Sequence, residues 1–402
     1  MWPVRSLGDA LSSAEVFVDG DWVESKDQDP EGDVRLVQLA DVGDGEYLNK
    51  SARFLTSSKA RELRCTFLKS GDIMLARMPD PLGRACIFPG DQKPSVTVVD
   101  VCIIRSDASK HDARWLMHCL NAPSCRNQIA SYATGSTRSR ISRGNLSKIK
   151  IPLPPLPEQK WIAAILDMAE ELRAKRRAAL AELNTLGQAI FLEMFGDPVA
   201  NPKGWPETAN LGDVADIVSG VTKGRKLNGR PTREVPYLAV ANVQDRVLNL
   251  SAVKTIDATE EEIARYRLKR NDLLLTEGGD PDKLGRGTLW SDELPECIHQ
   301  NHVFRVRLSS KAVHPVFLNW LVGSQRGKKY FLRSAKQTTG IASINMTQLR
   351  GFPLLLPPAN IQSAFADRVA SVEKHKAAHY ASLAEVDALF ASLRHRAFRG
   401  EL

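Results

Sequence analysis

The feature that most constrains how this chain folds is an internal repeat with a spacing of about 200 residues. Residues 180–186 (LAELNTL) recur as residues 383–389 (LAEVDAL), and the same separation of 203 relates Gln159 to Gln362. A repeat this long exceeds the period of a solenoid and corresponds to a whole folding unit. We therefore predict a tandem duplication with small insertions.

Each copy shows the same order of elements. Short β-branched and apolar runs broken by Gly, Pro and Asp, such as residues 95–104 and 301–306, predict strands. Proline-rich boundaries follow at 151–157 and 352–358, and proline disfavours helix at and before its own position. After each boundary we predict a long helix.

The predicted fold class is α/β (α+β), with two domains in tandem joined by two long antiparallel coiled-coil helices and a pseudo-two-fold internal repeat. The predicted boundaries are a first domain over 1–150, a boundary and helix over 151–196, a second domain over 197–356, and a boundary and helix over 357–402. The helices themselves are predicted near 158–195 and 361–398, and the first would be about 57 Å long.

Both helices carry apolar residues at alternating spacings of three and four, which is typical of a coiled-coil seam. Packing the two helices against each other within one chain would remove both seams from water. Polar residues interrupt each seam near its middle, and they act either as a register or partner contact or as snorkelling side chains. The predicted residues of the helix pair and of partner docking are Ile162, Ile165, Leu172, Arg176, Leu183, Leu186 and Ile190, and Phe365, Val372, Lys376, Leu383, Val386, Phe390 and Leu393.

Composition narrows the class of protein. With 43% hydrophobic and 25% charged residues the chain is an ordinary globular protein, and its net charge of +8 favours a polyanion, although solubility or an acidic partner would also explain it. No apolar run is long enough for a membrane span and the start lacks a signal core, so we expect a cytoplasmic protein. The six cysteines form no C-x-x-C pair, and we expect mostly buried, reduced thiols.

These features together resemble the specificity subunit of Type I restriction and modification systems, and the resemblance covers the whole chain. Its most specific parts are residues 156–159 (LPEQ) leading into a long helix, Leu-Gly-Asp at 7–9 and again at 211–213, and the ending 398–402 (FRGEL). The second boundary, residues 359–362 (ANIQ), departs from the family pattern. The resemblance implies two target recognition domains, each reading one half of a split DNA site, and helices that hold two methyltransferase subunits, which recruit restriction/motor subunits.

Motifs for catalysis are missing or incomplete. Residues 201–205 (NPKGW) lack the second proline of an adenine methyltransferase motif, and residues 323–329 (GSQRGKK) are one residue short of a phosphate-binding loop. Residues 280–283 (DPDK) lack the rest of a nuclease site, and a glycine-rich loop is the better interpretation. Residues 299–302 (HQNH) have no third metal ligand nearby, which favours a hydrogen-bonded loop. We therefore predict a subunit that is not an enzyme and has no metal site.

Three pairs of loops at matching places in the two copies combine cations with small polar residues, a mixture that suits phosphate contact and guanine reading by arginine. Taken singly, each could equally be a solvated turn. The loops are 19–28 and 223–230, 77–84 and 277–286, and 134–143 and 336–340. The candidate DNA-binding residues are Lys26, Gln28, Arg77, Arg84, Arg138, Arg140, Arg143, Lys223, Arg225, Lys226, Arg230, Lys283, Arg286, Lys336, Gln337 and Thr338.

The leading hypothesis is a sequence-specific, non-catalytic DNA-binding subunit that acts with two methyltransferase subunits and, through them, restriction/motor subunits. S-adenosylmethionine, ATP and Mg²⁺ are then expected on the partners and none in this chain. Two alternatives stay open: a self-sufficient DNA-processing enzyme with an unrecognised active site, and a specificity subunit of a modification-only or other phage-defence complex. Neighbouring methyltransferase and helicase-nuclease genes would favour the first hypothesis over an enzyme.

Overall fold

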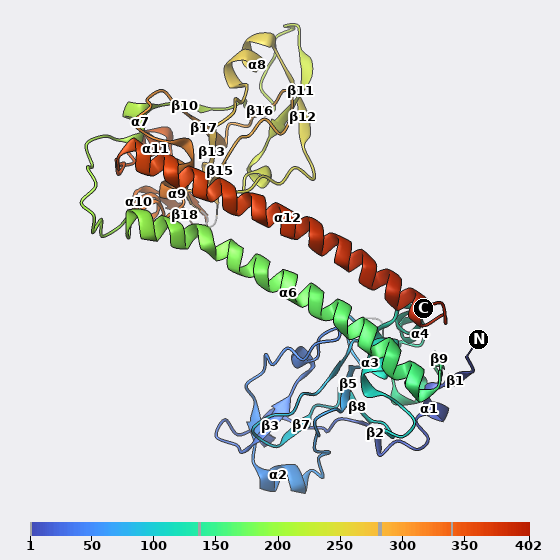
Figure 1. Cartoon of the computed structure of the whole chain (residues 1–402). Coiled ribbons are helices and arrows are strands. Elements are labelled where there is room, and N and C mark those ends of the chain that lie inside the picture. The colour runs from blue at the N-terminus through green and yellow to red at the C-terminus, as the bar shows by residue number, and fades with distance from the viewer. Residues whose placement is uncertain (1, 136–137, 280–283, 339–340) are drawn as a thin grey trace. The chain divides into compact units, whose positions relative to one another are not determined.

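The computed structural model describes residues 2–135, 138–279, 284–338 and 341–402 (Figure 1). The chain divides into two compact units. Unit 1 contains the residues up to Ala178 together with Tyr380–Leu402, and unit 2 contains Ala179–His379. Each unit therefore takes one half from each of the two long helices.

Unit 1 is built on two small sheets. The larger has the strand order β2-β8-β5-β6, formed by Val16–Asp19, Val101–Arg105, Ile73–Ala76 and Ala85–Ile87, and all of its pairings are antiparallel. The smaller has the order β4-β3-β7, formed by Phe54–Leu55, Val34–Val37 and Ser95–Thr97. β1 (Val4–Ser6) pairs with β9 (Lys150–Pro152). The shorter helices are α1 (Leu7–Ala10), η1 (Ser25–Asp27), η2 (Leu39–Asp41), α2 (Ser57–Glu62), α3 (Ala113–Asn121), α4 (Pro123–Ser131) and α5 (Arg143–Leu146).

Unit 2 repeats these two sheets strand for strand. Its larger sheet has the order β10-β17-β13-β15, formed by Ala215–Ser219, Val303–Leu308, Leu273–Thr276 and Gly287–Leu289. Its smaller sheet has the order β12-β11-β16, formed by Lys254–Ala258, Arg233–Leu238 and Ile298–His299. A third sheet, β14-β19-β18, is formed by Gly278–Gly279, Ile341–Ser343 and Lys336–Thr338. The shorter helices are α7 (Leu211–Val214), η3 (Val240–Asn242), α8 (Glu260–Tyr266), α9 (Pro315–Val322), α10 (Gln325–Ser334) and α11 (Met346–Arg350).

The two long helices are α6 (Leu156–Phe195) and α12 (Ala359–Ala397), close to the predicted ranges. In unit 1 the first half of α6 packs on the second half of α12, where Arg173 Nε lies 2.5 Å from Asp387 and the Arg173 guanidinium lies over the Phe390 ring. In unit 2 the second half of α6 packs on the first half of α12, where Phe191 meets Phe365. The helices are therefore antiparallel, as predicted.

The seam predicted for α12 is confirmed, because its apolar positions are buried or half-buried along the whole helix. Those positions are Phe365, Val372, Val386 and Phe390, which are buried, and Leu383 and Leu393, which are half-buried, as is the polar Lys376. In α6 the predicted seam is only partly correct. Ile162 is buried, and Ile165, Arg176, Leu183 and Ile190 are half-buried.

Leu172 and Leu186 were predicted in the α6 seam, but their side chains are 39% and 40% exposed. The buried stripe instead passes through Leu166, Leu180 and Phe191. The cause is that α6 packs on the globular part of each unit as well as on α12. Its buried face therefore differs from the face that would be buried if α6 packed on α12 alone. Leu166 belongs to the core of unit 1 and Phe191 to that of unit 2.

A buried glutamine joins each long helix to its unit. Gln159 Oε1 accepts from the backbone N–H of Asp112 (3.0 Å), while its Nε2 donates to the carbonyls of Lys110 and Pro154 (3.1 and 2.9 Å). The side chains of Gln159 and of the equivalent Gln362 are 1% and 0% exposed, so their amide groups depend on protein partners for their hydrogen bonds. The repeat noticed in the sequence is thus a repeated structural joint.

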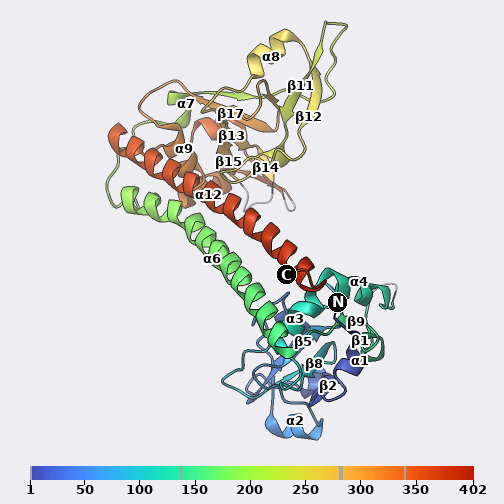
Figure 2. The same ribbon diagram turned by 45° about the vertical axis from the view of Figure 1, so that its right-hand side comes forward.

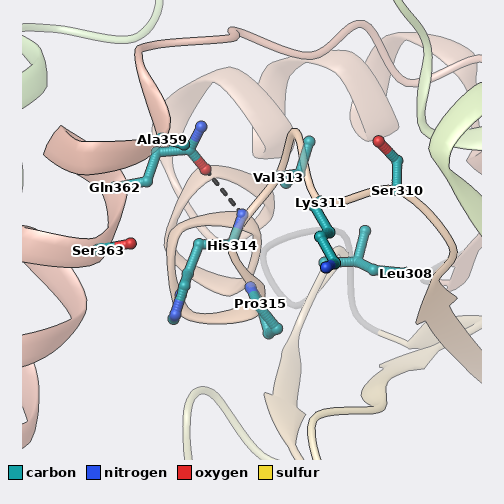
Figure 3. A pocket seen from close by; sticks show the side chains of 9 residues that line it. All are labelled: Leu308, Ser310, Lys311, Val313, His314, Pro315, Ala359, Gln362 and Ser363. Atoms are coloured by element: carbon teal, nitrogen blue, oxygen red, sulfur yellow. Dashed lines mark hydrogen bonds between the residues drawn. The ribbon is translucent and has the colours of Figure 1, made fainter.

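Gln362 makes the same three bonds in unit 2. Its Oε1 accepts from His314 N (2.8 Å), and its Nε2 donates to the carbonyls of Ala312 and Pro357 (3.0 and 2.7 Å). Figure 3 shows this joint beside a cavity of about 300 Å³ whose lining includes Lys311 and Val313.

All six cysteines are buried free thiols, in agreement with the expectation from their spacing. Over the described part of the chain, no helix combines the length and the apolar character that crossing a membrane requires.

Candidate nucleic-acid interface

Two of the three candidate loops of unit 1 start at one end of its larger sheet, and the third, which follows α4, meets them there. The strand register sets Asp19, the last residue of β2, opposite Cys102 and sets Ala76, the last residue of β5, opposite Val101. The third loop joins them, because Ile141 N donates to the carbonyl of Arg77 (3.0 Å). We call the group Asp19, Arg77, Asp100 and Arg140 the loop edge of unit 1.

Unit 2 brings the corresponding loops together in the same way. Ser219 lies at the end of β10 opposite Phe304, and Ser219 Oγ donates to the carbonyl of Asn301 (2.6 Å). Ile344 N donates to the carbonyl of Glu277 (2.9 Å), directly beyond β13 and next to β14 (Figure 2). We call the group Ser219, Glu277, Asn301 and His302 the loop edge of unit 2.

Arg77 is predicted to contact DNA, but the structure places it inside unit 1. Its side chain is 5% exposed, and its guanidinium donates to the carbonyls of Ile141 and Val99 (both 3.0 Å) and pairs with Asp19 at 2.8 Å. A buried guanidinium needs such acceptors because it has lost its water. Arg77 therefore ties the loops of this edge to one another, and we correct its assignment accordingly.

Arg84 is corrected for the same reason. It is 7% exposed and donates to four backbone carbonyls, those of Val42, Leu39, Met78 and Pro81. Burial lowers the pKa of its guanidinium. An arginine in a loop with Gly and Pro can either contact DNA or hold the loop together by bonding to its carbonyls. The hydrogen bonds of Arg84 favour the second role.

The other candidates of unit 1 remain near the surface. Arg138 is exposed, Arg140 pairs with Asp100 at 3.1 Å, and Arg143 is exposed and donates to the carbonyl of Phe17 (3.2 Å). Farther along the first loop, Lys26 is exposed and pairs with Glu24 at 2.7 Å, and Gln28 accepts from Arg53 Nη1 (2.8 Å). These residues stay candidates for DNA contact.

Two of the four cations in the basic loop 223–230 of unit 2 pair with glutamates of α8. Arg225 donates two 2.5 Å hydrogen bonds to the carboxylate of Glu262, and these bonds lower the pKa of Glu262. Arg230 lies 3.5 Å from Glu261. Arg225 is thus committed to the fold, whereas Lys223, Lys226 and Arg230 are exposed. The sequence shows three successive glutamates at 260–262, but not that they face this loop.

The remaining candidates of unit 2 lie on the other two loops. Arg286 is half-buried, and its Nη1 donates to Gln244 Oε1 (2.9 Å). Lys283 lies outside the described residues. The backbone of Lys336, Gln337 and Thr338 forms β18, and their side chains are outside the description.

The sequence-based interpretation missed a carboxylate and a histidine at the loop edge of unit 2. His302 Nδ1 lies 2.6 Å from Glu277 Oε2, and the two side chains are 55% and 32% exposed. The neighbouring His299 is fully buried against the carbonyl of Val303 (2.7 Å), and burial lowers its pKa to about 4. The expected hydrogen-bonded loop at 299–302 is confirmed, but nothing in the sequence links it to residue 277.

Unit 1 also contains a polar cavity away from its loop edge. This cavity of about 350 Å³ is lined by Arg173, Arg177, Asp387 and Arg394, and its carboxylates and guanidinium groups largely pair with one another. Among the described residues, no three or more His, Cys, Asp or Glu side chains are grouped to hold a metal ion. The arrangement offers hydrogen-bond donors and acceptors at two loop edges, which suits recognition.

The comparison with known families agrees with the duplication. The family model for the Type I restriction modification DNA specificity domain matches residues 19–183 and, a second time, residues 202–387. The chain belongs to this family. Each match includes one globular part and most of the long helix that follows it.

Similar curated members of this specificity family include two enterobacterial proteins. The Type I restriction enzyme StySPI specificity subunit of Salmonella potsdam is 27% identical over 308 residues, and the EcoKI specificity subunit of Escherichia coli strain K12 is 24% identical over 306 residues. Each alignment covers 72% of this chain and 65% of the relative. The chain therefore spans just under two thirds of the length of these relatives.

Solved structures support the fold. A chain from a structural study of complex assembly and conformational transition of the type I R-M system has a TM-score of 0.61 and 19% identity, with 100% of this chain and 98% of that chain covered. The S subunit of a Type I restriction-modification system from M. genitalium has a TM-score of 0.57 and 15% identity, with 99% and 96% covered. This chain therefore shares its fold with these two solved structures.

Proposed function

We propose that this chain is the non-catalytic specificity subunit of a Type I restriction-modification complex. Each unit would bind one half of a split DNA site through its loop edge. The observation that carries the proposal is the family match to both copies, combined with two equivalent sheets whose loop edges carry different side chains. Because the edges differ, the two half-sites should differ. Since the target is DNA, we assign the protein to the cytoplasm.

The long helices supply the proposed docking surface for two methyltransferase subunits. Leu186 and Leu389 occupy equivalent positions in the repeat, and their side chains are 40% and 50% exposed. α6 also exposes Trp161 and Met168. Two copies of one partner require the same contact twice, and an exposed leucine at the same place in both copies meets this requirement. S-adenosylmethionine, ATP and Mg²⁺ would then be bound by the partners.

Methylation mapping across a genome tests the proposed reading of DNA. Cells that carry this chain with its co-encoded methyltransferase should modify a bipartite, non-palindromic motif with one fixed spacer length. The purified chain alone should neither methylate nor cleave DNA, and methylation should appear when the partner is added. A palindromic or continuous motif, or methyl transfer by the isolated chain, would refute the proposal.

Native mass spectrometry tests the docking surface. Leu186→Glu or Leu389→Glu alone should reduce the complex from two methyltransferase subunits to one, and the double variant should bind none. Val247→Glu replaces an exposed apolar side chain that is not part of either long helix and serves as the matched control. Two bound subunits in the double variant would exclude these leucines as the docking site.

A further inference from the structure

The side chain that stands out at the loop edge of unit 2 is the carboxylate of Glu277. Its backbone is held on both sides, since its N–H donates to the carbonyl of His302 (3.0 Å) and its carbonyl accepts from Ile344 N (2.9 Å). The strand pairings on either side of this position, β13 with β17 and β14 with β19, keep the segment in register. The position of Glu277 is therefore fixed while its side chain remains partly exposed.

A short chain of hydrogen bonds orients this carboxylate. His302 lies 2.6 Å from Oε2 through Nδ1, and Asn301 Nδ2 lies 3.4 Å from His302 Nε2. In the tautomer with the proton on Nδ1, His302 donates to Glu277 and its Nε2 accepts from Asn301. Oε1 makes no hydrogen bond or ion pair with the described residues, so this oxygen can accept from a ligand.

A carboxylate on a surface that faces DNA can bind only certain groups of the DNA. It repels phosphate and it only accepts hydrogen bonds, so the complementary groups in the major groove are the exocyclic amino groups of cytosine (N4) and adenine (N6). Resting on the proposed function, we infer that Glu277, oriented by His302, reads such an amino group in one half-site. Glu277 is then a specificity-determining residue and His302 a positioning residue.

Unit 1 carries a different group at this place. The corresponding backbone position, which also accepts from the returning loop through its carbonyl, is Arg77, and this side chain is buried on Asp19. At that edge the side chains of Arg140 and Asp100 are 38% and 31% exposed, whereas the side chain of Arg77 is buried. The two units thus offer different groups to DNA from one framework.

The experiment compares the assembled complex of the full chain and its methyltransferase partner with the Glu277→Gln variant. Binding is measured on duplexes that carry every single base-pair change in both half-sites. The amide can donate as well as accept, so the variant should tolerate a keto oxygen where the wild type requires an amino group. Discrimination at one base pair should fall about tenfold or more, and the other positions should be unchanged. The base at that pair identifies N4 of cytosine or N6 of adenine as the group that is read.

Two further variants sharpen the result. His302→Ala should reduce discrimination at the same base pair by a smaller factor, because the carboxylate remains but loses its orientation. Glu234→Gln removes the charge of an exposed glutamate on β11 and should change nothing. The inference is overturned if Glu277→Gln leaves discrimination intact or alters affinity for all sequences alike. A wild-type complex without any sequence preference would instead refute the proposed function.

Discussion

At one equivalent backbone position the two units carry residues of opposite charge and opposite burial. Unit 1 has Arg77, which is 5% exposed and bonded to Asp19 and to loop carbonyls. Unit 2 has Glu277, whose side chain is 32% exposed and bonded to His302. The strands that lead to both positions are fully buried and pair in the same order. The framework is thus maintained by buried apolar strands, and the chemistry at the edge can vary without changing it.

A second pair of equivalent positions shows a smaller difference in burial and hydrogen bonding. Arg84 and Arg286 both follow Leu-Gly in the repeat. Arg84 donates to four carbonyls, whereas the Arg286 guanidinium makes one hydrogen bond with the described residues, to Gln244. Arg84 is thus a buried cation held in part by its own loop, whereas Arg286 is half-buried and bonds to a side chain outside its loop. Identical strings in the two copies therefore do not imply identical roles.

The largest loss of stability is expected for substitutions at the glutamine joint, which is the same in both units. Gln159→Leu and Gln362→Leu each remove three hydrogen bonds that a buried side chain makes to the backbone, at a cost of about 3 to 6 kcal/mol of unfolding free energy. Urea denaturation should show similar losses for both variants, because the joint is the same in both units. Gln325→Leu, at an exposed position of α10, is the control for the same chemical change. A loss confined to one variant would show that the joints are not equivalent.

The next effect separates the two loops. Arg84→Ala should lower the unfolding free energy by about 2 to 4 kcal/mol, because several carbonyls lose a charged donor away from water. Arg286→Ala should cost less than about 1 kcal/mol, as expected for a half-buried side chain with one hydrogen bond. Equal losses in the two denaturation curves would contradict the difference in burial between these loops.

The sequence predicted the structure correctly where a local pattern is compatible with only one arrangement of the backbone. The repeat predicted two equivalent units, and the proline boundaries and alternating apolar residues predicted the long helices. The α12 seam was correct, but in α6 the exposure of Leu172 and Leu186 was missed because the globular parts also pack on this helix. Tertiary contacts likewise decide that Arg77 is buried and that Arg225 meets Glu262, and no local pattern contains them.

A smaller effect concerns how the helices meet the two units. The repeat aligns Gly187 in unit 2 with Phe390 in unit 1, and a Cβ on Gly187 would come 2.5 Å from the ring of Trp320. Gly187→Ala should therefore destabilise the protein by about 1 to 3 kcal/mol through overpacking, although alanine favours helix. Combining it with Trp320→Leu should recover part of the loss in a double-mutant cycle. A stabilised single variant would show that the ring moves aside freely.

The smallest effect concerns the basic loop of unit 2, where Arg225 and Arg230 should behave differently. The hydrogen bonds from Arg225 hold the pKa of Glu262 below its ordinary value. The folded form is therefore stabilised above the unfolded pKa of glutamate, and this contribution is lost as the pH falls through the lowered folded value. Arg225→Ala should cost about 1 kcal/mol near pH 7, since both side chains are partly exposed, and this difference from the wild type should shrink towards pH 3 in denaturation curves.

In DNA binding, Arg225→Ala should leave discrimination between bases unchanged. Arg230→Ala, at an exposed position, should weaken binding to all sequences and reduce the slope of affinity against salt by about one. Loss of discrimination at a single base pair in Arg225→Ala would make this arginine a base reader and remove the distinction drawn between the two loops.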